Sequence, residues 1–158
     1  MTADPTMPRA DRLHELDALL VARITAIIAE ELAERRAQLA RISPESTVLV
    51  DDLAAFLGGG KLLRPRFCFW GGVAALGREP SAEEIDALAR MGAAIELVQA
   101  AALLHDDVID HSAVRRGRPA QHVKAQHDHE AAGLAGSAQD FGVAVAIVLG
   151  DLALSWAE

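Results

Sequence analysis

The stretch that decides the fold is IDALARMGAAIELVQAAALLHDDVID, residues 85–110 of this 158-residue chain. Its apolar residues recur at three- and four-residue steps, which predicts one long α-helix. Residues 95–104 are apolar on nearly every side, which indicates burial on most faces. Ser81 and Glu84 stand three residues apart directly before this stretch, in the spacing of a capping box that starts a helix.

Helices are also expected on both sides of this stretch. Residues 11–41 carry an apolar stripe at helical spacing, and shorter helical patterns follow. Pro65 is expected to open one of these helices and Gly77 to end it. The shorter predicted helices are 51–56, 65–76 and 141–157.

Two segments lack such a pattern. Residues 1–9 hold two prolines and are expected to be a disordered terminus. Residues 124–139 are rich in charge and glycine and are expected to form an exposed loop. The prediction is therefore one all-α domain over 1–158. The apolar helix 141–157 has no stop signal, so we expect the chain to be cut inside a larger fold.

Composition excludes several classes of protein. Only 4% of the residues are aromatic, which favours helices over sheet, and the net charge of −8 argues against a nucleic-acid partner. The single cysteine excludes an intramolecular disulfide framework. No run of 18 apolar residues and no apolar signal core is found, so we expect a cytoplasmic protein without a membrane span.

An acidic cluster ends the long helix. Asp106, Asp107 and Asp110 are spaced so that their carboxylates approach one face, where they would repel one another. Mg²⁺ would remove that repulsion, since it takes a few carboxylate oxygens and fills its other positions with water and phosphate oxygens. The alternative is a solvated helix end with scattered acids. The five histidines near or after the cluster lack zinc spacing.

Basic residues follow the acids and also lie far before them. Arg115 and Arg116 are of the residue type that binds phosphate oxygens bidentately. Lys61 and Arg64 follow three glycines, whose backbone N–H groups can approach an anion. Solvated basic turns are the alternative for both segments. Acids and arginines side by side favour a site for a magnesium diphosphate.

These segments together resemble the trans-type isoprenyl (polyprenyl) diphosphate synthases. The similarity lies in four motifs in the family's order, over about residues 43–158. They are GGKxxRP at 59–65, ELxxxxxLxHDDxxD at 96–110, RRGxP at 115–119 and FGxxxAxxxGDxxL at 141–154. The family's second Asp-rich motif and its Lys-rich stretch are not found in this sequence. The resemblance therefore implies the N-terminal half of a helical bundle of the isoprenoid synthase type.

The resemblance also implies roles for single residues. Asp106, Asp107 and Asp110 would bind Mg²⁺ and, with Arg115, the allylic diphosphate. Isopentenyl diphosphate would be held by Lys61, Arg64, Gln99 and Arg116. Gln99 stands where the family often has histidine; it donates hydrogen bonds but cannot become cationic. Ala101 and Ala102 would line the path of the growing chain, where small side chains leave room for a geranylgeranyl or longer product.

The function implied is a transferase of isoprenoid biosynthesis, a prenyltransferase that adds isopentenyl diphosphate to an allylic diphosphate. The isolated chain is expected to be inactive, because only the first Asp-rich half of the site is present. We expect a homodimer, or association with the missing C-terminal half. The alternative is a non-catalytic subunit, binding or regulatory, of a heteromeric or split prenyl synthase.

Overall fold

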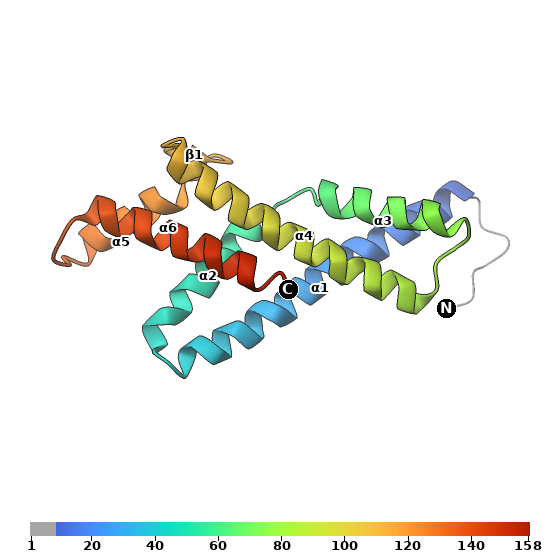
Figure 1. The fold of residues 1–158 in the computed structure, drawn as a ribbon, viewed down its shortest axis with the longest axis horizontal. Helices are drawn as coiled ribbons and strands as arrows, with labels where there is room; N and C mark the ends of the chain where they lie inside the picture. The colour runs from blue at the N-terminus through green and yellow to red at the C-terminus, as the bar shows by residue number, and fades with distance from the viewer. Residues whose placement is uncertain (1–8) are drawn as a thin grey trace. The chain divides into compact units, whose positions relative to one another are not determined.

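The computed structural model describes residues 9–158, and these residues are mostly helical (Figure 1). The all-α expectation is confirmed, with one short hairpin of two-residue strands added. The elements are α1 (Arg9–Ala40), η1 (Pro44–Ser46), α2 (Thr47–Leu57), α3 (Leu63–Leu76), α4 (Ala82–Ile109), β1 (Val114–Arg115), β2 (Arg118–Pro119), α5 (Gln121–Ala131) and α6 (Ala138–Ser155). The terminus predicted to be disordered lies outside the described residues except for Arg9, where α1 begins.

The chain divides into two compact units within α4, between Glu96 and Leu97. The first unit contains α1, α2, α3 and the first part of α4. The second contains the end of α4, the hairpin, α5 and α6.

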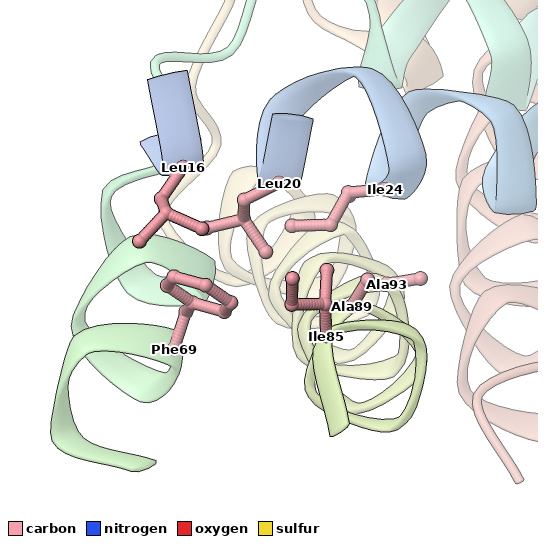
Figure 2. Packing of buried hydrophobic residues seen from close by; sticks show 7 residues of the cluster. All are labelled: Leu16, Leu20, Ile24, Phe69, Ile85, Ala89 and Ala93. Atoms are coloured by element: carbon pink, nitrogen blue, oxygen red, sulfur yellow. The ribbon is translucent and has the colours of Figure 1, made fainter. Parts of the chain in front are cut away.

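The core of the first unit lies between α1, α3 and α4. Leu16, Leu20 and Ile24 belong to the predicted stripe of α1, and they pack against residues of the other two helices (Figure 2). Those residues are Phe69, Ile85, Ala89 and Ala93. Ala89 and Ala93 stand four residues apart on α4, and both are buried in this core. At Gly92 an added Cβ would lie 2.9 Å from Cδ1 of Ile24 and 3.2 Å from Cβ of Pro65.

The connection from α3 to α4 is fixed at both ends by local chemistry. Gly77 ends α3 in the left-handed conformation with φ 64°, as expected. The capping box is confirmed, because Ser81 N–H donates to the Glu84 carboxylate at 2.7 Å and Glu84 N–H donates to Ser81 Oγ at 3.2 Å. Hydrogen bonds from the Arg78 guanidinium lower the pKa of Glu84 to about 2.

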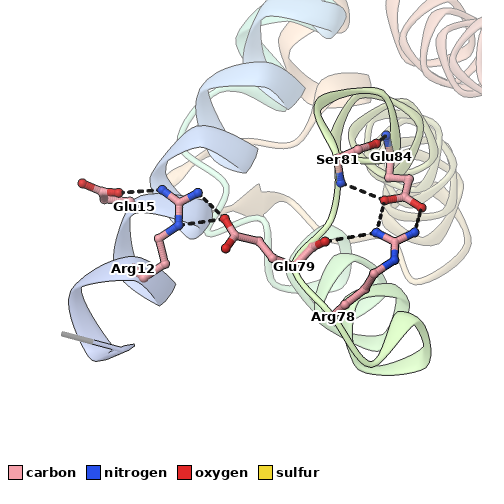
Figure 3. A network of polar contacts seen from close by, with 6 residues as sticks. All are labelled: Arg12, Glu15, Arg78, Glu79, Ser81 and Glu84. Carbon is pink, nitrogen blue, oxygen red and sulfur yellow. Dashed lines mark hydrogen bonds and ion pairs between the residues drawn. The ribbon is translucent and has the colours of Figure 1, made fainter. Parts of the chain in front are cut away.

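The same connection is tied to α1 by an ion pair. The Arg12 guanidinium contacts the carboxylates of Glu79 and Glu15, while Arg78 holds Glu84 on the other side of the loop (Figure 3). The hydrogen bonds that Arg12 donates to the Glu79 carboxylate raise the pKa of Arg12. These groups are on the surface, where such pairs orient a loop more than they stabilise a fold.

The second unit corrects the expectation of an exposed loop over 124–139. Residues 121–131 form α5, and only the segment between Ala131 and Ala138 is a loop. The sequence has no wide apolar stripe here, but Ala125 and His129 are buried, and the ring of His129 contacts that of Phe141 in α6. At Gly142 an added Cβ would lie 2.2 Å from the carbonyl oxygen of His122, so α5 and α6 touch through their backbones.

Two helices pass a test for membrane spans by length and composition, so the expectation that the chain has no membrane span stays a prediction. Both α4 and α6 are long and apolar enough to cross a membrane. The sequence contains no unbroken run of 18 apolar residues. The mean hydropathy of these alanine-rich helices is nevertheless high, because an average tolerates isolated polar residues. Buried helices of globular domains have the same composition, so the two helices do not assign this chain to a membrane.

Candidate functional site

The acidic cluster occupies the last turn of α4 and the residue after it. Asp106 and Asp110 are four residues apart and both are exposed, so their carboxylates are available on one face. Asp107 is fully buried, with its side chain only 1% exposed. Successive helical residues are rotated by about 100°, which directs Asp107 away from the face that Asp106 and Asp110 share. The structure therefore separates two carboxylates facing solvent from a third that faces the interior of the second unit.

The partner of Asp107 is Arg115. Nε of Arg115 lies 2.8 Å from each carboxylate oxygen of Asp107, and Nη2 lies 2.6 Å from Oδ1. Nη2 also lies 3.5 Å from the carboxylate of Asp106. These hydrogen bonds, aided by the charges of all three aspartates, raise the pKa of Arg115. Arg115 thus remains cationic and neutralises the only buried carboxylate of the cluster.

The hairpin that follows explains how Arg115 reaches back to α4. Val114 pairs with Pro119 and Arg115 pairs with Arg118 in antiparallel register. The turn between them has positive φ at both central residues, 52° at Arg116 and 76° at Gly117. This is the pattern of a type I′ turn, which matches the twist of a hairpin. The side chain of Arg116 is exposed at the turn, and among residues 9–158 no carboxylate pairs with it.

Lys61 and Arg64 lie in the first unit, around the start of α3. Both side chains are exposed, and within the described chain neither is paired with a carboxylate. The backbone between them is unusual, because Leu62 has φ 49° and packs against the apolar core of this unit. Helix α3 begins at Leu63 rather than at Pro65, whose missing N–H is harmless in a first turn.

Arg66 is a residue that the sequence analysis missed. Its Nη1 donates to the carbonyl oxygen of Lys61 at 3.1 Å, and its Nη2 lies 3.1 Å from the Asp17 carboxylate of α1. It therefore ties the segment that carries Lys61 to the longest helix of the unit. No sequence signal identifies this contact, because Arg66 and Asp17 are far apart in the chain.

The remaining predicted residues lie on α4 before the acids. Gln99 is half-buried, Ala101 is buried and Ala102 is exposed. Val98, Ala102, Asp106 and Asp110 follow at four-residue steps and are all exposed, so they form one stripe that is apolar first and acidic afterwards. Only Ala102 of the two alanines lies on the stripe that leads to the acids.

His105 is a second residue that the sequence analysis left without a role. It precedes Asp106 directly, and its Nε2 lies 3.1 Å from the carbonyl oxygen of Ile147 in α6. The signal that could have identified it is Gly150, a glycine inside a long apolar helix. Such a glycine often marks a close approach.

The donor set fits Mg²⁺ in one specific way. Asp106 and Asp110 supply hard carboxylate oxygens, which Mg²⁺ prefers, and it completes its shell with water and phosphate. Within residues 9–158, no three His, Cys, Asp or Glu side chains are grouped so as to hold a metal ion by themselves. The residues therefore fit a Mg²⁺ ion shared with a diphosphate and do not form an all-protein cage.

Fold and site together define an all-α protein with exposed carboxylates and arginines suited to a metal-bound diphosphate. The sequence model of the polyprenyl synthetase family matches residues 47–158. The chain belongs to this family.

Similar proteins carry names that agree with this assignment. The chain is 38% identical over 95 residues to the short chain isoprenyl diphosphate synthase of Methanothermobacter thermautotrophicus, covering 59% of this chain and 27% of that protein. It is 37% identical over 123 residues to the nonaprenyl diphosphate synthase of Mycobacterium tuberculosis, covering 76% of this chain and 33% of that protein. The chain thus spans about a third of these relatives' length or less.

A solved structure shows the same helical arrangement. It is the geranylgeranyl pyrophosphate synthase from Corynebacterium glutamicum, complexed with isoprenyl diphosphate and magnesium. The TM-score is 0.73 at 35% sequence identity, over 90% of this chain and 39% of that one. The isoprenoid synthase type of fold predicted from the motifs is confirmed.

Proposed function

We propose that this chain carries the first Asp-rich half of a prenyltransferase site that adds isopentenyl diphosphate to an allylic diphosphate. The observation that carries the proposal is the end of α4. There, Asp106 and Asp110 present exposed carboxylates beside a cationic Arg115 that Asp107 holds in place. A metal-bound diphosphate needs both signs of charge within a few ångströms, because the metal requires carboxylates and the phosphate oxygens require arginine.

The residues have distinct tasks in this proposal. Asp106 and Asp110 would hold Mg²⁺, which supplies Lewis-acid stabilisation of the departing diphosphate. Arg115 supports the same negative charge from the side of the hairpin, since two of its nitrogens are already oriented by Asp107. When the allylic C–O bond breaks, its electron pair leaves with the diphosphate. The double bond of isopentenyl diphosphate then forms the new C–C bond, and a proton is lost.

The second diphosphate is assigned to exposed cations. Lys61, Arg64 and Arg116 are free of carboxylate partners among residues 9–158, so their charge is available to a ligand. Gln99 is half-buried and would contribute a hydrogen bond. Exposed cations without acidic partners favour an anionic second substrate over a neutral one.

The apolar part of the α4 stripe is assigned to the growing chain. Ala102 is exposed one turn before Asp106, whereas Ala101 is only 3% exposed. In a preparation that forms product, Ala102→Phe would therefore obstruct the path of the growing chain and shorten the products. Chromatography of the dephosphorylated prenols would show this. A phenylalanine at 101 would instead overpack the interior and lower stability. If the Ala102→Phe variant formed unchanged products, the growing chain would not pass residue 102. The small side chain at 102 would then give no reason to expect geranylgeranyl or longer products.

Calorimetry tests the proposal directly. An allylic diphosphate analogue should bind the chain only with Mg²⁺ present, and Mg²⁺ alone should bind weakly. Asp106→Ala or Asp110→Ala should reduce the Mg²⁺-dependent affinity at least about tenfold, because each removes a metal ligand or its charge. Asp128→Ala is the control, since it removes an exposed carboxylate of the same unit. Equal affinity for the analogue in the Asp106 and Asp128 variants would refute the assignment.

A non-catalytic subunit is the second candidate function. Under this alternative the chain binds the allylic diphosphate but forms no product. Product formed from both diphosphates by the chain, with its mass verified, would exclude this alternative and would also overturn the expectation that the isolated chain is inactive. The predicted dimer and cytoplasmic location stay predictions.

A further inference from the structure

His105 connects the metal-facing end of α4 to α6. Its Nε2 lies 3.1 Å from the carbonyl oxygen of Ile147 and 3.5 Å from Oδ1 of Asp151. A carbonyl oxygen only accepts hydrogen bonds, so Nε2 carries the proton and donates it. The contact thus fixes the orientation of the ring as well as its distance from α6.

Gly150 provides the space for this ring. An added Cβ at this position would lie 2.2 Å from Nε2 and 2.5 Å from Cδ2 of His105. The imidazole therefore lies directly over the backbone of α6, where every other residue type would place a side chain. Glycine inside a helix is otherwise unfavourable, so its use here indicates that the close approach has a purpose.

We propose that His105 is a positioning residue, which locks the last turn of α4 onto α6 and thereby fixes the spacing of Asp106 and Asp110. This inference rests on the proposed function of those two carboxylates. Helix ends open easily, and an open last turn would let the carboxylates move apart. The turn is closed by backbone hydrogen bonds from Asp110 N–H to Asp106 O at 2.8 Å and from Ser112 N–H to Asp107 O at 2.9 Å. The lock of His105 on α6 begins one residue before this turn.

Other tasks for His105 fit the geometry less well. Among residues 9–158 no metal-binding group of histidines and acids is formed, so it has no partners for zinc. Its Nε2 is engaged with a backbone carbonyl rather than directed to a ligand. Its neighbour Asp107 is likewise used structurally, through Arg115. These two side chains flank Asp106 and both hold the start of the last turn.

Amide hydrogen exchange of the 158-residue chain tests the lock without any ligand. His105→Leu keeps bulk but loses the donor, and His105→Gln keeps an N–H near the place of Nε2. We expect His105→Leu to raise the exchange rates of Asp110 and Ser112 about tenfold, since one hydrogen bond of ordinary strength is lost. His105→Gln should stay within about threefold of the parent chain, as should His127→Ala, which removes an exposed imidazole from the same unit.

The outcomes separate positioning from general destabilisation. Unchanged exchange at Asp110 and Ser112 in His105→Leu, or equal rates in the Leu and Gln variants, would overturn the proposal. If His105→Leu unfolds the second unit as a whole, the His105→Gln variant provides the test. Slow amide exchange at Asp110 in that variant supports the lock, and fast exchange overturns it. Gly150→Ala should raise the same rates by displacing the ring but have little further effect when His105 is already alanine.

Calorimetry with inorganic pyrophosphate and Mg²⁺ tests whether His105 affects binding at the proposed site. The Mg²⁺-dependent affinity should fall about tenfold in His105→Leu and be retained in His105→Gln, with His127→Ala as control. Equal affinities in the Leu and Gln variants would refute a role in positioning. If the parent chain binds no pyrophosphate, the proposed function fails, while the exchange rates still show whether His105 closes the turn.

Discussion

The pair formed by Asp107 and Arg115 should be the most sensitive point of the second unit. Arg115→Ala would leave the Asp107 carboxylate, 1% exposed, without the one cation that pairs with it among residues 9–158. Removing one partner of a buried ion pair costs about 3–5 kcal/mol, because the other charge stays buried and unpaired. Since the Arg115 side chain is 26% exposed, water can enter the space it leaves. We therefore expect a loss of about 2–4 kcal/mol in the free energy of unfolding.

Urea unfolding followed by circular dichroism measures this loss. For a denaturant slope of about 2 kcal/mol per molar, the midpoint should fall by roughly 1–2 M. Arg116→Ala is the matched control, because its side chain is exposed and unpaired within the described chain, and its midpoint should change by less than about 0.3 M. Asp107→Asn should cost less than Arg115→Ala, because the Arg115 left behind is partly exposed and still lies 3.5 Å from Asp106.

Equal midpoints for the two arginine variants would refute the reasoning. They would mean that the carboxylate of Asp107 finds water or another donor at no cost, and that its burial is not maintained in solution. Arg115 would then have no structural task, and any effect of its removal on diphosphate binding would be a direct one.

Two other predictions follow from local geometry. Gly142→Ala should destabilise the chain by at least about 2 kcal/mol in urea, because its Cβ would lie 2.2 Å from the carbonyl oxygen of His122. Gly71→Ala should instead stabilise the chain by about 0.5–1 kcal/mol, because nothing lies within 4 Å of an added Cβ. A lower free energy of unfolding in both glycine variants would contradict this account. Arg78 lowers the pKa of Glu84 to about 2, so the ionised Glu84 carboxylate stabilises the folded state. This stabilisation is complete above pH 4.5 and is lost as the pH falls toward 2. Glu84→Gln should flatten the fall in melting temperature between pH 4.5 and pH 2; an unchanged slope would refute it.

The helices were predictable because their signals are local. The stripe of Leu16, Leu20 and Ile24 is periodic in sequence and forms the core in the structure. The capping box of Ser81 and Glu84 needs only four residues, and it forms as predicted. Short-range patterns therefore identified the elements of the first unit.

The details of the site depend on contacts that no local pattern contains. That Asp107 is buried follows from Arg115 returning to it, which requires the hairpin turn at Arg116 and Gly117. Helix α5 was missed for a similar reason, since burial of Ala125 and His129 beside α6 stabilises it more than its own sequence does. Acid spacing alone could therefore identify the cluster but not divide it into two exposed carboxylates and one buried one.

The strained backbone points to the same residues as the motifs do. Among residues 9–158, three non-glycine residues have positive φ: Leu62, His111 and Arg116. Each adjoins or belongs to the predicted diphosphate or metal positions, since Leu62 follows Lys61 and His111 follows Asp110. A non-glycine residue in this conformation costs about 1–2 kcal/mol and persists only where its surroundings enforce it. At Leu62 this conformation is maintained by packing against the core. Next to His111 it is maintained by the hydrogen bond that Ser112 N–H donates to Asp107 O, and beside Arg116 by the contact of Arg115 with Asp107. In each unit, the backbone beside these charged residues is therefore held in one conformation.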